Sequence, residues 1–272
     1  MKNRAIGVFD SGIGGLTVYK ALIEKLPHEK VIYLGDTARL PYGTKSAETI
    51  IKFSDGNALF LLTKSVKIIV VACNSASSYA IPFLQGKFDI PIIGVIEPGA
   101  EAAVKFSKTK IGVIGTTATI NSGAYEKSIV EKKPGVQVIS KACPLFVPLV
   151  EEGWLDHEAT RLISREYLLP LKEQGIDTLV LGCTHYPVLK KTIAEVIGDE
   201  IKLVDSALTT AEKVHSILKS LGWINDREKT GNDEFFVTDS PERFKLVGEI
   251  FLNRKIEKVT TASFYTVSLP QA

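Results

Sequence analysis

The chain has 272 residues, 45% hydrophobic and 24% charged, so it is long enough for one large or two modest globular domains. Its 33 Lys and Arg against 31 Asp and Glu leave a formal net charge of +2, which gives no electrostatic footprint for nucleic acid. Three cysteines without framework spacing argue against a secreted disulfide scaffold, and no apolar stretch approaches the roughly 18–20 residues of a membrane span.

The N-terminal segment is predicted to be the first strand and not a signal peptide, because Asp10 ends its apolar run after a few residues. We therefore expect a soluble protein of the reducing cytoplasm, with no nucleic-acid or membrane partner. The strand, residues 5–9, leads into a Gly-rich turn at 10–15. Apolar residues at helical spacing then predict a helix from Leu16 that Pro27 terminates.

The next elements alternate in the same way. A strand at 31–34 leads into a polar loop at 35–43, and Ser46 is a good N-cap for the helix that follows. Further strands are expected at 68–71, 92–96, 111–114, 136–139, 178–181, 201–204, 235–238 and 259–264. Helices are expected near 75, around Tyr125, and over 158–174, 188–196, 209–221 and 241–252. Strands alternating with helices predict parallel sheets.

Two cysteines occupy matching positions in this pattern. The run Ile68–Val71 ends in Ala72 and Cys73 before polar residues, and Thr178–Leu181 ends in Gly182 and Cys183. Short apolar runs of this kind predict buried strands, and the carboxyl ends of such strands are where open α/β sheets bind ligands. A second echo pairs Ile6-Gly7-Val8 with Ile111-Gly112-Val113 at nearly the same spacing.

These echoes predict an α/β fold of two similar open-sheet lobes, related by pseudo-two-fold symmetry, with the active site between them. The first lobe is expected to be discontinuous, comprising residues 1–97 plus 208–272, because the C-terminal part matches nothing in the second lobe, 98–207. Facing lobes would present one thiol from each side of a shared cleft.

The polar turns after these strands predict the ligand. Gly-rich turns at helix N-termini favour anions, but the third glycine of the dinucleotide fingerprint is replaced by Thr17, and no P-loop Gly-Lys-Ser/Thr follows. The remaining groups suit a carboxylate: Ser11, Asn74, Ser75, Thr116, Thr119 and Thr184. Asp10 suits an ammonium group, so together these residues indicate an amino acid.

Two thiols facing an amino acid predict chemistry at Cα. Racemisation needs a base on one face of Cα and an acid on the other, and a thiolate can serve as the base. His185, two residues after Cys183, could tune that thiol, and Asp10 and Glu152 are further candidates. Glu151 and Glu152 are adjacent, so on a helix they point in different directions, and the sequence alone does not choose between them.

Four blocks of this sequence resemble glutamate racemases of bacterial cell-wall synthesis: Asp10–Leu16, Pro41–Gly43, Ala72–Ser77 and Leu181–Pro187. They stand in the family's order and the resemblance covers essentially the whole chain. It implies that L- and D-glutamate are interconverted without a cofactor or metal, in the cytoplasm, for peptidoglycan synthesis, cell-wall biogenesis and cell shape. We also expect a homodimer, and the start at the first strand predicts that the N-terminal extension of precursor-activated members is missing.

The resemblance also implies roles for individual residues. Cys73 and Cys183 are the acid/base pair, acting on the D- and the L-isomer respectively, with assistance from Asp10, Glu152 and His185. The implied substrate-binding residues are Asp10, Ser11, Pro41, Tyr42, Gly43, Asn74, Ser75, Thr116, Thr119, Thr184 and His185.

Other interpretations of the same residues stay open at this point. Aspartate racemase or a related enzyme of the superfamily would share the thiols, a Cys-dependent hydrolase would need only one, and an amino-acid-binding protein would need neither. Cys183-x-His185 could be half of a metal site, but no Cys/His cluster supplies further ligands. Cys143 is expected to be a buried structural thiol.

Overall fold

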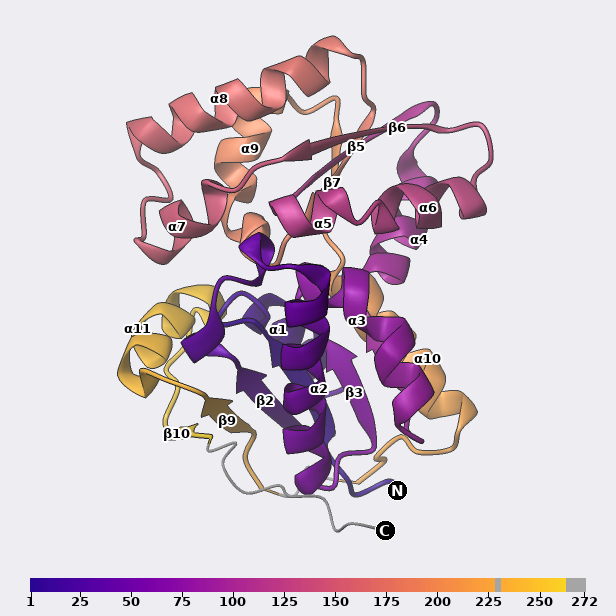
Figure 1. Cartoon of the computed structure of the whole chain (residues 1–272), viewed down its shortest axis with the longest axis vertical. Coiled ribbons are helices and arrows are strands. Elements are labelled where there is room, and N and C mark those ends of the chain that lie inside the picture. The colour runs from indigo at the N-terminus through magenta and orange to yellow at the C-terminus, as the bar shows by residue number, and fades with distance from the viewer. Residues whose placement is uncertain (228–230, 263–272) are drawn as a thin grey trace.

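The computed structural model describes residues 1–227 and 231–262, and these form two lobes stacked along the long axis of the molecule (Figure 1). The N-terminus lies at the far end of the lower lobe. Each lobe is built around one sheet, and the predicted α/β class with two parallel-sheet lobes is confirmed.

The lower lobe contains a six-stranded sheet in the order β10-β9-β2-β1-β3-β4, in which every neighbouring pair is parallel. Its strands are β1 (Ile6–Asp10), β2 (Val31–Gly35), β3 (Ile68–Val71), β4 (Ile92–Gly94), β9 (Glu234–Val237) and β10 (Val259–Thr261). The late strands β9 and β10 extend this sheet beyond β2, so the chain returns to the first lobe after completing the second.

Helices cover both faces of this sheet. They are α1 (Leu16–Lys25), α2 (Ala47–Thr63), α3 (Asn74–Lys87), α10 (Ala207–Ser220) and α11 (Pro241–Leu252). Alternate residues of the central strands point to opposite faces, so Val8 packs in the core with α1, α10 and α11, whereas Phe9 packs in the core with α2 and α3. Ser46 caps α2 as expected, because its Oγ accepts a hydrogen bond from Thr49 N.

The upper lobe contains a four-stranded parallel sheet in the order β6-β5-β7-β8. Its strands are β5 (Lys110–Gly115), β6 (Gln137–Ala142), β7 (Thr178–Gly182) and β8 (Lys202–Val204). Its helices are α4 (Ile96–Phe106), α5 (Thr117–Asn121), α6 (Ala124–Lys132), α7 (Phe146–Glu151), α8 (Glu158–Glu173) and α9 (Lys190–Ile197), with short 3₁₀ turns at Thr37–Arg39, Tyr42–Thr44 and Tyr186–Leu189.

The four shared strands follow one order in both sheets. In the first sheet β2-β1-β3-β4 are neighbours, and in the second β6-β5-β7-β8 are neighbours, so β1 corresponds to β5 and β3 to β7. These are the strands that the two sequence echoes predicted to match. Cys73 therefore follows β3 at the position where Cys183 follows β7.

Several element boundaries differ from the predicted ones. The helix expected near residue 75 begins at Asn74, directly after Cys73, and the strand expected at 92–96 ends at Gly94, because α4 begins at Ile96. The strand expected at 136–139 extends to Ala142, because β6 pairs with β5 over its whole length. Part of the strand expected at 259–264, and of the predicted first lobe, falls at 263–272, outside the described residues.

A buried ion pair joins four segments at the far end of the lower lobe. Lys67 Nζ lies 2.6 Å from Glu29 Oε2 and donates to the carbonyl oxygens of Lys2 and Trp223, and both charged side chains are buried. Glu29 also accepts a hydrogen bond from Asn225 N. The pair thus connects the N-terminal segment to the segment after α10.

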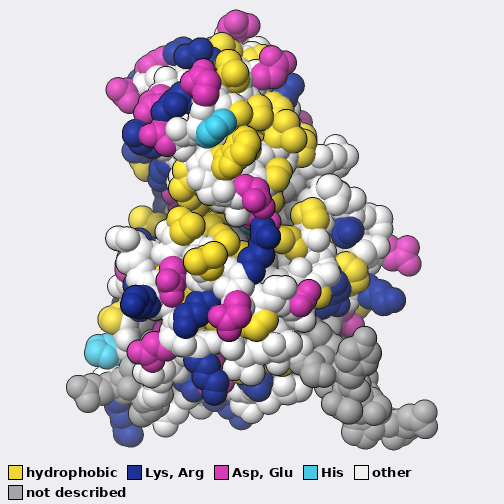
Figure 2. All heavy atoms as spheres, turned by 90° about the vertical axis from the view of Figure 1, so that its left-hand side faces the viewer, with side chains coloured by type: hydrophobic (Ala, Val, Ile, Leu, Met, Phe, Trp, Pro, Cys, Tyr) yellow, Lys and Arg dark blue, Asp and Glu magenta, His cyan; other side chains and the backbone are white. Residues whose placement is uncertain are grey.

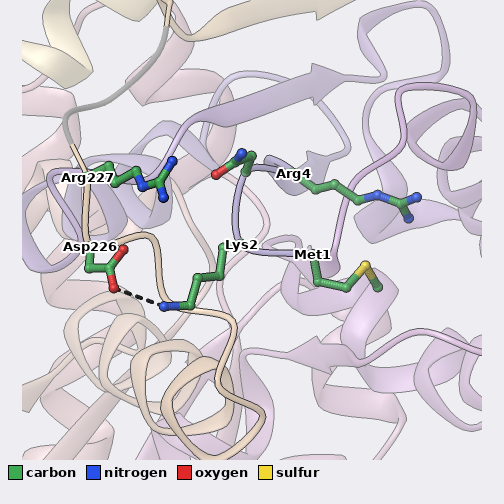
Figure 3. A pocket seen from close by; sticks show the side chains of 6 residues that line it. Met1, Lys2, Arg4, Asp226 and Arg227 are labelled. Atoms are coloured by element: carbon green, nitrogen blue, oxygen red, sulfur yellow. Dashed lines mark hydrogen bonds and ion pairs between the residues drawn. The ribbon is translucent and has the colours of Figure 1, made fainter.

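The surface beside this pair is polar. Lys2 Nζ donates to Asp226 Oδ2 at 2.9 Å, in a shallow pocket that Arg4 and Arg227 also line (Figure 3). Both partners of this second ion pair are exposed, so it is weakened by solvent screening. Among the described residues, every helix is too short or too polar to serve as a membrane-spanning segment.

Removing one partner of the buried pair should destabilise the fold. Lys67→Ala leaves the Glu29 carboxylate buried without its cation, and we expect a loss of about 3–5 kcal/mol in the free energy of unfolding, measured by urea denaturation. Lys2→Ala, at the same end of the lobe, removes an exposed pair and should cost less than about 1 kcal/mol. Equal losses in the two variants would contradict this account.

Candidate active site

A pocket between the lobes contains both predicted thiols. It is lined by Ser11, Leu40, Pro41, Tyr42, Gly43, Cys73, Asn74 and Ser75 from the lower lobe, and by Thr116, Val147, Cys183, Thr184 and His185 from the upper lobe. The cavity itself has a volume of only about 20 Å³, so the side chains of the two lobes nearly fill the space between the thiols. The structure thus brings together residues that lie more than a hundred positions apart.

Cys73 lies on the lower-lobe side of the pocket. Its side chain is 5% exposed, and its thiol donates to Ser11 Oγ at 3.5 Å. Burial, reinforced by the negative charge of Asp10, raises the pKa of the Cys73 thiol to about 12, although hydrogen bonds from Ala76 N and Ser11 oppose the shift. Cys73 is therefore protonated at neutral pH in the ligand-free protein.

Cys183 is part of a polar chain of three side chains. Its Sγ lies 3.9 Å from His185 Nδ1, and His185 Nε2 lies 3.0 Å from Glu151 Oε1. Burial lowers the pKa of His185, but hydrogen bonds with Cys183 and Glu151, and the charges of both, outweigh burial and raise this pKa to about 10. A cation at His185 can stabilise negative charge that develops on the Cys183 sulfur.

The structure places Glu151, and not Glu152, beside His185. Glu151 is the last residue of α7, and its carboxylate turns inward to the imidazole. Glu152 follows the helix and points outward, where it pairs at 3.0 Å with the exposed Arg243 of α11. The assisting position expected for Glu152 is thus occupied by its neighbour, because successive residues of a helix point about 100° apart.

Asp10 lies behind the pocket wall. The carboxylate is completely buried, accepts a hydrogen bond from Gly12 N at 2.9 Å, and is bonded by Thr184 Oγ1 at 3.4 Å. Burial raises the pKa of Asp10, and the nearby His185 lowers it in part. The Gly-rich turn is therefore not an open anion site as expected, because Asp10 of the same turn engages its amide groups.

The glycines of this turn permit the lobes to approach. A Cβ atom at Gly14 would lie 2.3 Å from Thr184 Oγ1 and 2.6 Å from His185 Nδ1. A side chain at Gly14 would therefore displace the loop that follows Cys183. Gly43 has the same role on the other side, where a Cβ would lie 2.6 Å from Thr116 Cβ. Both contacts join residues of opposite lobes.

Three hydroxyl groups form a cluster across the lobe boundary. Ser75 Oγ lies 2.9 Å from Thr116 Oγ1 and 3.3 Å from Thr119 Oγ1, and the two threonines lie 3.0 Å apart. Ser75 and Thr116 line the pocket, while Thr119 is in the second layer behind them. Hydroxyl groups can rotate to donate, so this cluster suits a carboxylate.

The Tyr42 ring is held from behind. Its hydroxyl donates to the completely buried Asp36, which also accepts hydrogen bonds from Arg39 Nε at 2.8 Å and from Thr238 Oγ1 at 3.0 Å. Asn57 Nδ2 donates to the Tyr42 oxygen at 3.0 Å. The phenol group is thus used within the protein, and the Pro41-Tyr42-Gly43 loop is fixed in place.

One polar atom of the pocket has no partner among the described residues. Asn74 is 3% exposed and begins α3; its Oδ1 accepts from Tyr125 OH at 2.8 Å, but its Nδ2 is buried and makes no hydrogen bond. A buried donor without an acceptor costs about 1–3 kcal/mol. This amide group therefore indicates a ligand that supplies an acceptor.

Three features of the site could not be foreseen from the sequence patterns used above. These are the choice of Glu151, the Asp36 network behind Tyr42, and the apolar wall made by Leu40 and Val147. Cys143 is completely buried and does not line the pocket. In the described parts of the chain, no group of three or more His, Cys, Asp or Glu side chains is arranged to hold a metal ion.

Comparisons with known proteins show which family this chain belongs to. The family model described as Asp/Glu/hydantoin racemase matches residues 6–214. A glutamate racemase of Geobacter metallireducens is 52% identical over 267 residues, which span 98% of this chain and 97% of that protein. The resemblance predicted from four sequence blocks is thereby confirmed.

Solved structures agree with this result. A glutamate racemase isoform from Bacillus anthracis superposes with a TM-score of 0.93 at 40% identity, covering 97% of this chain and 98% of that one. The glutamate racemase of Francisella tularensis in complex with D-glutamate superposes with a TM-score of 0.92 at 42% identity, covering 97% and 99% of the two chains.

The pairing of His185 with Glu151 can be tested by titration. In Glu151→Gln the imidazole loses its carboxylate partner, so we expect the pKa of His185 to fall below the wild-type value of about 10. The measurement is an NMR titration of the ring signals, with His185→Asn used to assign them among the 4 histidines. Glu152→Gln should leave the titration unchanged, and a shift in that variant alone would contradict the assignment.

Proposed function

Because the chain belongs to the Asp/Glu/hydantoin racemase family, we propose that it is a glutamate racemase, an isomerase that interconverts L- and D-glutamate with two thiols. The observation that carries this proposal is that Cys73 and Cys183 follow corresponding strands of two lobes and line one pocket. Racemisation is the reaction that needs two such groups, because one base on one face of Cα returns the proton with retention.

The protonation of the site suggests how a cycle begins. Cys73 carries its proton at neutral pH, and His185 beside Cys183 is cationic. In the L-to-D direction, the Cys183 thiolate removes the proton from Cα, and the Cys73 thiol gives its proton to the opposite face. The product leaves Cys183 protonated and Cys73 ionised, and the D-to-L direction reverses these states.

The polar groups around the thiols bind the substrate. The unpartnered Asn74 Nδ2 and the Ser75–Thr116–Thr119 hydroxyls offer donors to a carboxylate, and Ser11, Thr184 and the Pro41-Tyr42-Gly43 loop complete the wall. Asp10 acts through Thr184 and the Gly-rich turn, since its carboxylate is buried behind them. Glu151 orients and charges His185 in the role first expected of Glu152.

The hydrolase alternative has one feature in its favour. Cys183, His185 and Glu151 form a nucleophile–base–carboxylate chain of the kind that cysteine hydrolases use. A hydrolase, however, leaves Cys73 and its buried, protonated environment without a role. The two-thiol reaction uses both halves of the pocket.

Several broader properties belong to the same proposal. We infer that the reaction needs no cofactor or metal, that the protein works in the cytoplasm, and that its product D-glutamate serves peptidoglycan synthesis and thereby cell shape. We also propose the division of the chain into lobes 1–97 plus 208–272 and 98–207, and the membership of the strands in two separate sheets supports it.

We further propose a homodimer. Hydrophobic side chains gather on the face shown in Figure 2, which includes the side of the molecule where α7, α8 and α11 lie. Leu162 of α8 and Leu246 and Ile250 of α11 are 55%, 71% and 52% exposed, and exposed apolar patches mark interaction surfaces.

Either Cys73→Ser or Cys183→Ser should lower racemisation by roughly 10²–10⁴-fold, because each removes one acid/base group. The measurement follows optical rotation of L- and of D-glutamate in buffered D₂O without added cofactor, together with deuterium entry at Cα. Cys143→Ala, which changes a buried thiol outside the pocket, should retain activity. Full activity of Cys183→Ser would refute the two-thiol reaction. Deuterium entry at Cα of aspartate but not of glutamate would instead identify aspartate as the substrate.

His185→Asn should slow turnover more with L-glutamate than with D-glutamate as substrate. The variant removes the cation beside Cys183, the thiol assigned to the L-isomer, and leaves the surroundings of Cys73 unchanged. Initial rates in both directions give the comparison. Equal losses in kcat would instead assign His185 a general role in binding.

A further inference from the structure

We propose that Tyr125 is a positioning residue that turns the amide of Asn74 so that its NH₂ group donates to the bound substrate. Tyr125 lies on α6 of the upper lobe, and Asn74 begins α3 of the lower lobe (Figure 1). The Tyr125 hydroxyl donates across the lobe boundary to Asn74 Oδ1. The inference rests on the proposed function, because it takes glutamate as the ligand of the pocket.

The orientation of the amide follows from one proton. An amide has an oxygen that accepts and a nitrogen that donates, and a phenol has a single proton to give. Tyr125 OH donates this proton to Asn74 Oδ1 at 2.8 Å. The Nδ2 end is then directed away from Tyr125, on a side chain that lines the pocket.

The Nδ2 atom is the observation that points to a ligand. It is buried and has no hydrogen-bond partner among the described residues, although Asn74 is only 3% exposed. A donor in this state is satisfied when an acceptor such as a carboxylate oxygen enters. A flipped amide would present Oδ1 instead, and an oxygen acceptor facing a carboxylate is repulsive.

Packing holds the tyrosine in the position this requires. A Cβ atom at Gly99 would lie 3.0 Å from the Tyr125 hydroxyl oxygen, and one at Gly182 would lie 3.1 Å from its ring. Gly99 is in α4, directly after the chain enters the upper lobe, and Gly182 precedes Cys183. The Tyr125 ring thus lies between Gly99, where the chain enters the upper lobe, and Gly182, which precedes Cys183.

A phenylalanine fits the same position without the proton. Tyr125→Phe should therefore raise KM for both isomers and leave kcat nearly unchanged, because the lost interaction serves substrate and transition state alike. One buried hydrogen bond corresponds to a loss in kcat/KM of about fivefold to tenfold. A purely structural defect would lower the fraction of active enzyme, and hence kcat, instead.

The chain offers a matched control. Tyr79 of α3 also donates its hydroxyl across the lobe boundary, to Ala118 O of α5 at 3.0 Å, but its acceptor is a backbone carbonyl. Tyr79→Phe removes the same group from another contact between the lobes, without touching a pocket side chain. We expect its kcat/KM to stay within about twofold of wild type, since half-buried single contacts contribute little.

A double-mutant cycle with Asn74 decides the question. Asn74→Ala alone should raise KM, and Tyr125→Phe should cause no further loss in that background, because its only route to the substrate has been removed. The same loss from Tyr125→Phe in both backgrounds, or a loss equal to that of Tyr79→Phe, would overturn the proposal. A wild-type protein that exchanges no Cα proton of glutamate would refute the proposed function instead.

Should Tyr125→Phe fail to fold, as seen by circular dichroism, Asn74→Asp provides the test. This variant keeps an oxygen that accepts from Tyr125 OH and replaces the NH₂ group by an oxygen that cannot donate. We expect KM to rise for both isomers, with kcat nearly retained. An unchanged KM in Asn74→Asp would then overturn the proposal.

Discussion

The pocket depends on the parallel pairing of every strand in both sheets. Parallel strands end at one edge, so β1 and β3 deliver Ser11 and Cys73 to the same place, and β5 and β7 deliver Thr116 and Cys183. Since the two sheets share one strand order and face each other at these edges, a single pocket receives a thiol from each lobe. The helices that pack on the two sheets hold these strand ends in position.

The two halves of this pocket differ in electrostatics although they share a topology. Burial and the nearby Asp10 carboxylate keep the Cys73 thiol protonated. Cys183, in contrast, lies beside an imidazole that Glu151 keeps charged. The unequal surroundings follow from side chains that the two lobes do not share.

Several contacts between the lobes lie around the pocket. The Ser75–Thr116 hydroxyl pair, the Thr184–Asp10 hydrogen bond and the Tyr125–Asn74 hydrogen bond each join one lobe to the other. Because Gly14 and Gly43 have no side chains, the two lobes can approach each other closely at these positions. The geometry of the pocket is therefore sensitive to the angle between the lobes, and residues that line the pocket also hold the lobes together.

The sequence by itself determined the alternating elements, the correspondence of the two cysteine strands and most pocket residues, because periodicity and turn chemistry act over a few neighbouring positions. Only the tertiary structure decided between Glu151 and Glu152, since that choice depends on the direction in which α7 meets His185. It likewise showed Asp10 holding its own turn and Asp36 holding Tyr42. Which side chains meet in these contacts depends on how the backbone turns, and no repeating pattern in one sequence records that.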